Sequence, residues 1–300
     1  MRDASPNCLL AREGLMQRIR RVYGSVSDFA LIRRSLCEYS IKTVFHLASQ
    51  TQVGVAKKDP LGTLEANVQG TWHMLEAARL AGVGETLVAS SDKAYGASLH
   101  LPYEETHPLQ GRYPYDVSKS CVDLISTMYG LTYGMRVGVV RCANLFGGGD
   151  LNLSRMLPDL IRATLRGEKF VIRSDGKYVR DFLYVEDGVT AYLLLAEELA
   201  KSPALAGEAF NFSLGIRVTV LELVRTVLEM MGRGDLQPVI QNSASSEVRE
   251  QYTACHKARR VLGWSPHYTL EEGLKATIAW YTEFFADERR AKPAIASVCV

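Results

Sequence analysis

Tyr115 and Lys119 stand four residues apart in a segment, residues 113–133, whose pattern predicts one long helix. Residues at this spacing share a helical face, so the phenol and the ammonium can lie side by side. A neighbouring ammonium favours the phenolate and lowers the pKa of a tyrosine, which then can act as a base. The spacing alone is common, and a solvated helix face is an equally good interpretation.

A second polar cluster, Ser91-Asp92-Lys93, comes at the end of residues 86–91, an apolar run typical of a buried strand. In doubly wound α/β folds, ligands bind at the carboxyl ends of the parallel strands. A hydroxyl, a carboxylate and an ammonium at such an end could all face one substrate. Ser and Asp are also common in helix caps and turns, but the position favours a functional role.

Four other features carry weaker signals. His46 lies inside an apolar strand and is predicted to be a core histidine. The run Gly147–Gly149 is not followed directly by a helix, which favours a flexible loop over a phosphate cradle. Arg180 and Arg249 could each bind a phosphate, although a surface ion pair, for Arg180 with Asp181 or Asp187, is at least as good an interpretation.

The first half of the chain alternates strand-like and helical segments that would position these residues. Repeated β-α-β order predicts a doubly wound parallel sheet, a Rossmann-like α/β fold. The run 43–48 is apolar throughout, as in a strand covered by helices on both faces. The expected strands are residues 21–23, 43–48, 86–91 and 137–141, and the expected helices are 28–39, 61–81 and 113–133.

The second half is less regular and predicts a smaller α/β lobe beside the sheet. Thr219 with Glu222 and Thr269 with Glu272 have capping-box spacing, which predicts two helix starts. Short strands are expected at 170–172 and 209–212. The expected division is a Rossmann-like domain at 1–146 and mainly a substrate-binding lobe at 147–300, with parts of 180–213 rejoining the first domain.

Composition excludes several classes of protein. The chain has 300 residues, of which 47% are hydrophobic and 23% charged, unlike a disordered or fibrous chain. Its net charge of +2 predicts no nucleic-acid partner, and no apolar run approaches the ~18 residues of a membrane span. The six cysteines form no C-x-x-C pair and no metal-ligand spacing occurs, so we expect reduced thiols, no metal and a cytoplasmic location.

One expected element is missing from the sequence. A dinucleotide-binding fold opens with a strand, a glycine-rich turn and a helix, because the pyrophosphate rests on that helix's N-terminus. No G-x-G-x-x-G or G-x-x-G-x-x-G stands before Arg21. We therefore expect an N-terminally truncated fold that lacks a unit of about 30–40 residues.

Together, these segments resemble the extended short-chain dehydrogenase/reductase family, and within it the nucleotide-sugar dehydratases, from Arg21 to about Phe285. Relatives typically carry Thr-Asp-Glu where this chain has Ser91-Asp92-Lys93, and the lysine is similar to the CDP-glucose 4,6-dehydratase type. Sugar 4-epimerases of the same family usually lack the Asp-Lys or Asp-Glu pair. The matching segments are Phe45–Ala48, Asn67–Thr71, Ser90–Gly96, Tyr115–Lys119, Arg180–Asp187 and Leu262–Trp264.

The resemblance implies NAD as cofactor and a nucleotide sugar, with CDP-glucose favoured, as substrate. Tyr115 would take the proton of the sugar's 4-hydroxyl, Ser91 would hydrogen-bond that oxygen, and Lys119 would hold the nicotinamide ribose. Asp92 would then protonate the leaving C6 hydroxyl, with Lys93 as part of the base at C5. The resemblance also places Leu47, Ala48, Ser49 and Asn67 near the cofactor, and Asn144, Arg180 and Arg249 on the substrate diphosphate.

Other interpretations stay open at this level. The chain could be another nucleotide-sugar dehydratase, an epimerase, or a non-catalytic remnant that serves only in assembly. The resemblance also implies a homodimer in which helices 61–81 and 113–133 pack against their twins. An apolar stripe on the second of these helices could form that contact or could face the sheet; its members are Cys121, Leu124, Ile125 and Met128.

Overall fold

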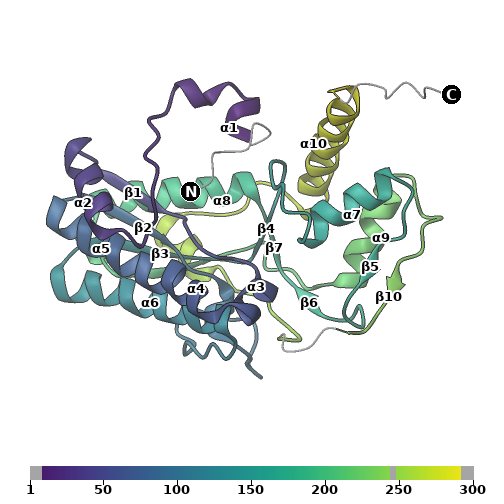
Figure 1. Ribbon diagram of the computed structural model, residues 1–300. Helices are drawn as coiled ribbons and strands as arrows, with labels where there is room; N and C mark the ends of the chain where they lie inside the picture. The colour runs from purple at the N-terminus through teal and green to yellow at the C-terminus, as the bar shows by residue number, and fades with distance from the viewer. Residues whose placement is uncertain (1–8, 244–247, 292–300) are drawn as a thin grey trace.

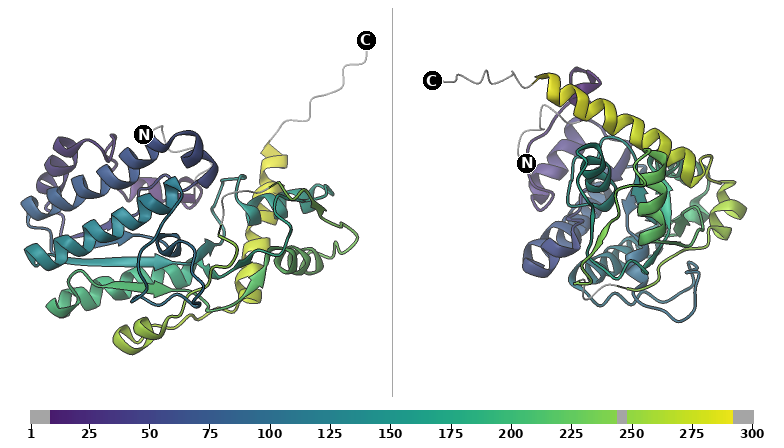
Figure 2. Two further views of the ribbon diagram at one scale, coloured as in Figure 1. Left: turned by 90° about the horizontal axis from the view of Figure 1, so that it is seen from below. Right: turned by 90° about the vertical axis from the view of Figure 1, so that its right-hand side faces the viewer.

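The computed structural model describes residues 9–243 and 248–291, with a parallel four-stranded sheet at its centre (Figure 1). The strand order is β1-β2-β3-β8, and every neighbouring pair is parallel. Helices cover both faces of this sheet (Figure 2), which confirms the predicted doubly wound α/β class. The strands are β1 (Thr43–His46), β2 (Glu85–Ala89), β3 (Arg136–Cys142) and β8 (Ala209–Phe212).

The helices of this first lobe form where local signals predict them. The Asp28 side chain accepts a hydrogen bond from Leu31 N at 3.0 Å and caps α2. A single π-helical segment, Glu65–Gln69, joins α4 to α5, so the predicted helix 61–81 is a continuous rod. The helices are α2 (Phe29–Glu38), α3 (Val53–Lys58), α4 (Pro60–Leu64), α5 (Gly70–Ala81), α6 (Pro114–Tyr133) and α8 (Val185–Lys201).

Two predictions about the first strands are wrong. Residues 21–23 are exposed and form no strand, and the strand expected at 43–48 ends at His46. In the described part of the chain β1 is an edge strand, with β2 as its one neighbour. A strand needs a hydrogen-bonding partner, and residues 21–23 have none here. For the same reason β1 is covered incompletely, and Phe45 and Leu47 are 39% and 57% exposed.

Within the described residues, the second lobe has three main helices and three two-stranded sheets. Both predicted capping boxes form: Thr219 and Glu222 exchange hydrogen bonds at the start of α9, and Thr269 and Glu272 do so before α10. The helices are α7 (Met156–Leu165), α9 (Val220–Met230) and α10 (Leu270–Ala291). The strand pairs are β4 (Asn144–Phe146) with β7 (Phe182–Tyr184), β5 (Val171–Ile172) with β10 (Val239–Ile240), and β6 (Val179–Arg180) with β9 (Val218–Thr219).

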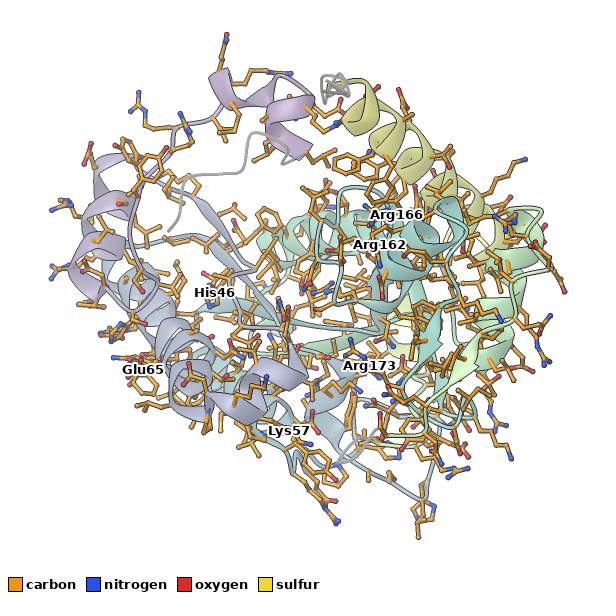
Figure 3. The ribbon with its side chains drawn as sticks, turned by 45° about the vertical axis from the view of Figure 1, so that its right-hand side comes forward. His46, Lys57, Glu65, Arg162, Arg166 and Arg173 are labelled. Carbon is orange, nitrogen blue, oxygen red and sulfur yellow. The ribbon has the colours of Figure 1, made fainter. Side chains whose placement is uncertain are left out.

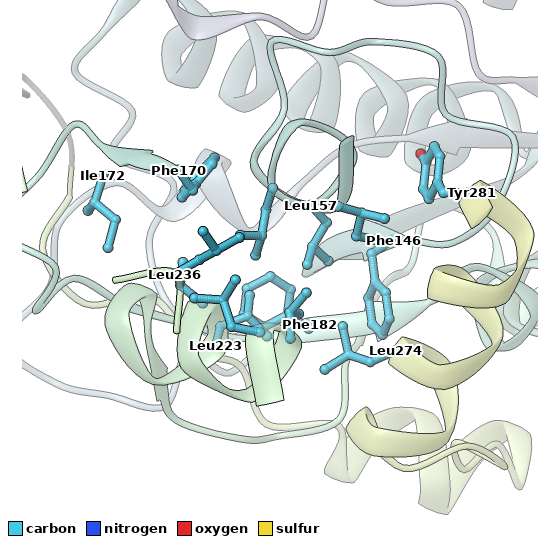
Figure 4. Packing of buried hydrophobic residues seen from close by; sticks show 14 of the residues in the cluster. Phe146, Leu157, Phe170, Ile172, Phe182, Leu223, Leu236, Leu274 and Tyr281 are labelled. Atoms are coloured by element: carbon cyan, nitrogen blue, oxygen red, sulfur yellow. The ribbon is translucent and has the colours of Figure 1, made fainter. Parts of the chain in front are cut away.

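Each lobe has its own hydrophobic core. In the second lobe α7, α9 and α10 pack their apolar faces together over β5 and β7 (Figure 4). In the first lobe α8 and β8 share a core with β3 and with Trp264, which is 2% exposed. Residues 185–212 therefore lie with the first lobe. The labelled core residues in Figure 4 are Phe146, Leu157, Phe170, Ile172, Phe182, Leu223, Leu236, Leu274 and Tyr281.

Shorter segments complete the fold. The run Gly147–Gly149 is a loop, but it is packed rather than open, because a Cβ at Gly147 would lie 2.3 Å from Val185 Cγ1. Helix α1 (Leu9–Arg12) lies beside α10, and Arg12 forms an ion pair with Asp287 at 2.9 Å (Figure 2). Among the described helices, none combines the length and the apolar character that crossing a membrane requires.

Candidate active site

The polar cluster after β2 forms the turn that the site is built on. The strand β2 ends at Ala89, Ser90 and Ser91 follow, and a one-turn 3-10 helix, Asp92–Tyr95, begins next with Ser91 as its N-cap. The Ser91 hydroxyl accepts a hydrogen bond from Lys93 N at 3.2 Å and donates one to Asp92 Oδ1 at 3.0 Å. Ser91 is thus a cap, as one interpretation of the sequence has it, and it also faces the cavity described next.

The turn and helix α6 enclose one cavity of about 520 Å³. It lies at the carboxyl ends of β2 and β3, where ligands bind in doubly wound folds. The two clusters found in the sequence therefore come together here. The lining includes all five residues predicted to be catalytic: Ser91, Asp92, Lys93, Tyr115 and Lys119.

The expected effect of Lys119 on Tyr115 is not seen. Burial raises the pKa of Tyr115, and a hydrogen bond with Ser91 opposes the rise only in part. The Lys119 ammonium lies 5.9 Å from the centre of the Tyr115 ring and donates to Ala89 O at 2.7 Å. Burial also lowers the pKa of Lys119 to about 8. Desolvation, which disfavours both charged forms, therefore outweighs the attraction between them.

Asp92 has the properties of a proton donor. Its side chain is 2% exposed, and burial raises its pKa, with Lys93 and Ser91 opposing the rise. Its Oδ2 atom and the neighbouring Ser90 Oγ are buried without a hydrogen-bond partner in residues 9–243 and 248–291. Buried polar atoms are normally paired, so these two are available to a ligand. Both residues line the cavity.

Of the six residues predicted to lie near the cofactor, Ala48 and Asn67 do not line this cavity. The four that line it are Leu47, Ser49, Tyr115 and Lys119. Asn67 instead shapes the loop after β1. Its Oδ1 accepts from Ser49 Oγ at 2.9 Å and from Gln50 N at 2.6 Å, while its Nδ2 donates to Gln50 O at 3.0 Å and to Ser118 Oγ at 2.8 Å. Asn67 thus acts on the cavity through Ser49.

A second cavity, of about 240 Å³, extends into the other lobe and contains Asn144 and Arg180. Asn144 lines both cavities. Arg180 does not lie at the surface, as the alternative of a surface ion pair requires. Arg180 is buried and donates to Val179 O and Arg249 O, whereas the Asp181 carboxylate accepts from the backbone of Phe182 and of two other segments.

Arg249 stands apart from both cavities. Its side chain is 64% exposed and pairs with Asp175 at 3.3 Å. Only its backbone carbonyl reaches the site, where it accepts from Arg180 at 3.2 Å. The side chain of Arg249 is therefore not brought together with the other candidates. Arg173, in contrast, lines the second cavity; Figure 3 shows it in the second lobe and His46 in the first.

His46 is the core histidine that the sequence predicts. It is 4% exposed, and its Nε2 lies 3.1 Å from the Thr71 hydroxyl. Since Thr71 donates its hydrogen to Asn67 O at 2.6 Å, the His46 Nε2 is the donor in this contact. Burial, with a smaller contribution from Lys119, lowers the pKa of His46 to about 4.

Two residues of the site escape sequence reasoning. Arg155 lines both cavities and donates to Thr51 Oγ1 at 2.9 Å, which joins the lobes across the first cavity. Gln251 accepts a hydrogen bond from Lys93, although 158 residues separate them. No local pattern marks either residue, because each acts through contacts that only the folded chain creates.

Comparison with known proteins identifies the family of this fold and site. The model of the NAD dependent epimerase/dehydratase family matches residues 2–212. The chain belongs to this family, whose members are NAD-dependent. This confirms the resemblance to the extended short-chain dehydrogenase/reductases.

Individual relatives agree with this assignment. The chain is 28% identical over 280 residues to a CDP-glucose 4,6-dehydratase of Salmonella typhimurium, covering 88% of this chain and 77% of the relative. It is 30% identical to a dTDP-glucose 4,6-dehydratase of Streptomyces griseus, covering 79% and 71%.

Solved structures of similar fold also include dehydratases and epimerases of nucleotide sugars. A dTDP-glucose 4,6-dehydratase of Streptomyces venezuelae with NAD bound has a TM-score of 0.82 at 27% identity, covering 91% of this chain and 83% of that one. A UDP-glucose 4-epimerase of Thermotoga maritima with UDP-glucose has a TM-score of 0.82 at 29% identity, covering 90% and 88%. Dehydratases and epimerases thus share this fold.

Proposed function

We propose that this protein is an NAD-dependent nucleotide-sugar 4,6-dehydratase, with CDP-glucose as the favoured substrate and a 4-keto-6-deoxy sugar as product. One observation carries the proposal: Ser91, Asp92, Lys93, Tyr115 and Lys119 line a single cavity. The oxidation needs Tyr115 and Lys119. The elimination needs the acid Asp92 and the amine Lys93. A cavity with both sets suits a reaction that combines the two steps.

The first cavity fits the nicotinamide-ribose end of NAD. Lys119 offers a buried ammonium, Ser49 and Tyr115 offer hydroxyls, and Leu47 offers an apolar wall. The unpaired Ser90 Oγ is a further hydrogen-bonding group. NAD, when bound, accepts the hydride from C4 and brings a positive charge that favours the phenolate of Tyr115. No glycine-rich turn for the pyrophosphate occurs in the 300 residues.

The first step is oxidation at C4 of the sugar. Tyr115 takes the proton of the 4-hydroxyl, while Ser91, which lines the same cavity, holds the same oxygen. Lys119 positions the ribose. Because burial raises the pKa of Tyr115, this step requires a cationic ligand beside the phenol. Transfer of the 4-hydroxyl proton to Tyr115 is thereby coupled to the binding of NAD.

The second step removes water across C5 and C6. The 4-ketone acidifies the C5 proton, which passes to a base that includes Lys93. Asp92 gives its proton to the C6 hydroxyl, which leaves as water; its raised pKa keeps that proton available. Hydride from the bound cofactor would then return to C6, and the base would return a proton to C5, so that the net change would be the loss of one water with the cofactor regenerated.

The second cavity suits the nucleotide half of the substrate. Asn144 and Arg180 would bind the diphosphate, since Asn144 lines both cavities and Arg180 is a buried cation. Arg249 belongs to the proposal as a third contact, provided that its exposed side chain leaves Asp175. The preference for CDP rests on the Ser91-Asp92-Lys93 sequence and on the dehydratase relative of Salmonella typhimurium.

Product analysis tests the proposal. The purified protein is incubated with NAD and, in parallel, with the CDP, dTDP, GDP and UDP derivatives of glucose. We expect a product lighter than the substrate by one water, identified by mass spectrometry and as a 4-ketone by NMR, fastest with CDP-glucose. A product of unchanged mass that is inverted at C4 would identify an epimerase instead, the activity of the Thermotoga maritima neighbour. No change with any sugar, together with no NAD binding in calorimetry, would favour a non-catalytic role.

The proposal includes a homodimer in the cytoplasm. Leu124 and Met128 of α6 are exposed, while Ile125 packs into the core, so part of the predicted stripe faces away from the sheet. This supports the use of α6 as a contact surface. The thiols of Cys37, Cys121, Cys142 and Cys255 are all unpaired, as in a reducing compartment; Cys8 and Cys299 lie outside the described residues.

A further inference from the structure

Gln251 reaches the active-site turn from the far end of the chain. It lies on an extended segment beside β6, where its backbone N donates to Val179 O at 3.1 Å and Val179 N donates to Arg249 O at 3.0 Å. On the other side of the segment, Tyr103 N donates to Tyr252 O at 3.0 Å. These backbone contacts fix the segment, and the Gln251 side chain is completely buried.

The amide of Gln251 is oriented by Lys93. Its Oε1 accepts a hydrogen bond from Lys93 Nζ, whereas its Nε2 has no hydrogen-bond partner within the described residues. A buried N–H without a partner is costly, and turning the amide over would set that N–H against the ammonium. The side chain therefore leaves one donor unpaired in order to present its carbonyl oxygen to Lys93.

A neutral acceptor has a specific consequence for a lysine. A carboxylate in the same place would hold the amine in its charged form, because an opposite charge raises the pKa of a lysine. An aliphatic side chain would remove this hydrogen bond from the amine. An amide carbonyl restrains the amine and still lets it release a proton, which a lysine must do to act as a base.

We propose that Gln251 is a positioning residue that holds Lys93 Nζ in place for proton transfer at the sugar's C5 and C6. The inference rests on the proposed dehydratase function, to which it adds a residue outside both predicted clusters. It assigns Gln251 to the elimination half of the reaction and not to the oxidation at C4, where Tyr115 and Lys119 act.

Several titratable and charged groups surround this contact. Asp92, in the same turn, interacts electrostatically with Lys93. The remaining groups interact electrostatically with Asp92 or with its neighbours. They come from the loop after the turn, from helix α6, from the segment before α7 and from β6. They are Asp92, Tyr103, Tyr115, Asp116, Arg155 and Arg180.

Two substitutions at Gln251 distinguish its effect on the position of Lys93 Nζ from the effect of a charge at residue 251. Gln251→Leu removes the acceptor, and since a misplacement of about 1 Å can cost about 100-fold in rate, we expect the elimination to slow by that order. Gln251→Glu keeps an acceptor but adds a charge that raises the pKa of Lys93, so we expect the acidic limb of the rate profile, which the base sets, to move upward by about 1–3 pH units. Tyr252→Phe, in the same segment but outside both cavities, is the matched control.

Single-turnover kinetics with CDP-glucose and NAD resolve the two halves. Reduced nicotinamide reports oxidation at C4, and incorporation of solvent deuterium at C5 reports elimination and return. In Gln251→Leu we expect oxidation at the rate of the unsubstituted protein, slow deuterium incorporation, an unchanged KM and a transient build-up of reduced nicotinamide. Equal losses in both halves would mean a structural role only, and unchanged kinetics in both variants would overturn the inference.

A measurement without turnover keeps the inference separate from the proposed function. NMR titration of the Lys93 side chain in the complete protein follows its pKa directly. We expect a higher pKa in Gln251→Glu than in the unsubstituted protein and no change in Tyr252→Phe. Equal pKa values in all three proteins would overturn the inference. A failed dehydratase assay with the expected titration would overturn only the reaction assigned to the site.

Discussion

Asp92 and Lys119 line the same cavity, and burial moves their pKa values toward each other. The pKa of Asp92 is raised, and that of Lys119 is lowered to about 8, because desolvation disfavours both charged forms. A carboxyl group that keeps its proton and an amine that releases its proton near neutrality both suit proton transfer. The sequence predicts these residue types. It does not predict their pKa values, which depend on how deeply the sheet and α6 bury them.

Asp92→Asn tests the acid at the residue scale. An amide cannot protonate the C6 hydroxyl, so we expect kcat to fall about 10²–10⁴-fold, the usual contribution of a general acid. Oxidation at C4 does not use Asp92, so reduced nicotinamide accumulates, which its absorbance follows in a stopped-flow instrument. Asp235→Asn, at an exposed ion pair with Arg233, is the control. Loss of oxidation and elimination together would contradict the assigned role.

His46 makes a testable contribution to the pH dependence of stability. Its pKa of about 4 lies below the usual value of 6.5, so between these pH values the folded protein binds fewer protons than the unfolded chain. The stabilisation is complete above pH 6.5 and is lost as pH falls toward 4. At about 1.4 kcal/mol per pKa unit, the free energy of unfolding falls by roughly 3 kcal/mol across this range.

His46→Gln removes this dependence while keeping an N–H that can donate to Thr71. Urea unfolding at several pH values measures the difference between the two proteins. Asp181 has the opposite sign, since burial raises its pKa to about 6, but it is present in both proteins and cancels in the comparison. Parallel stability curves for the two proteins would contradict the assignment.

At the scale of elements, the sequence predicts what local contacts decide. The capping boxes at Thr219 and Thr269 form as predicted, because their partners stand three residues away. The helix 61–81 forms as predicted. Its buried residues include the polar Thr63 and Asn67, whereas the large apolar Trp72 is 42% exposed. The strand expected at 21–23 fails because pairing is not local. The contact between Lys93 and Gln251 cannot be predicted from local sequence either, because only the folded chain brings the two residues together.

Thr219→Ala tests a locally encoded element. The substitution removes the side-chain oxygen that caps α9, so we expect a loss of about 1 kcal/mol in the free energy of unfolding. Because α9 packs into the core of the second lobe, thermal or denaturant unfolding detects the loss. Thr282→Ala, at an exposed position of α10, is the control and is expected to change stability by less than about 0.5 kcal/mol. Equal effects would exclude the cap as the cause.

At the scale of the whole molecule, the rod formed by α4 and α5 lies beside α6 as the outer layer on one face of the sheet (Figure 2). Leu131 of α6 is 75% exposed, and Leu61 at the start of the rod is 68% exposed. Large apolar side chains gathered on two adjacent helices are typical of a protein–protein contact. This outer face also carries other exposed apolar residues: Leu64, Trp72, Leu80, Leu124 and Met128.

Introducing negative charges on this apolar face tests the proposed homodimer. Leu124→Glu with Leu131→Glu places two carboxylates among apolar neighbours, and two α6 helices in a twofold contact would bring four such charges together. We expect the unsubstituted protein to scatter light as a dimer and the double variant as a monomer with unchanged circular dichroism. Leu193→Glu, at a residue that is 50% exposed on α8 at the opposite face of the sheet, should remain dimeric. A monomeric unsubstituted protein, or dissociation by Leu193→Glu alone, would remove the basis for assigning the contact to α4, α5 and α6.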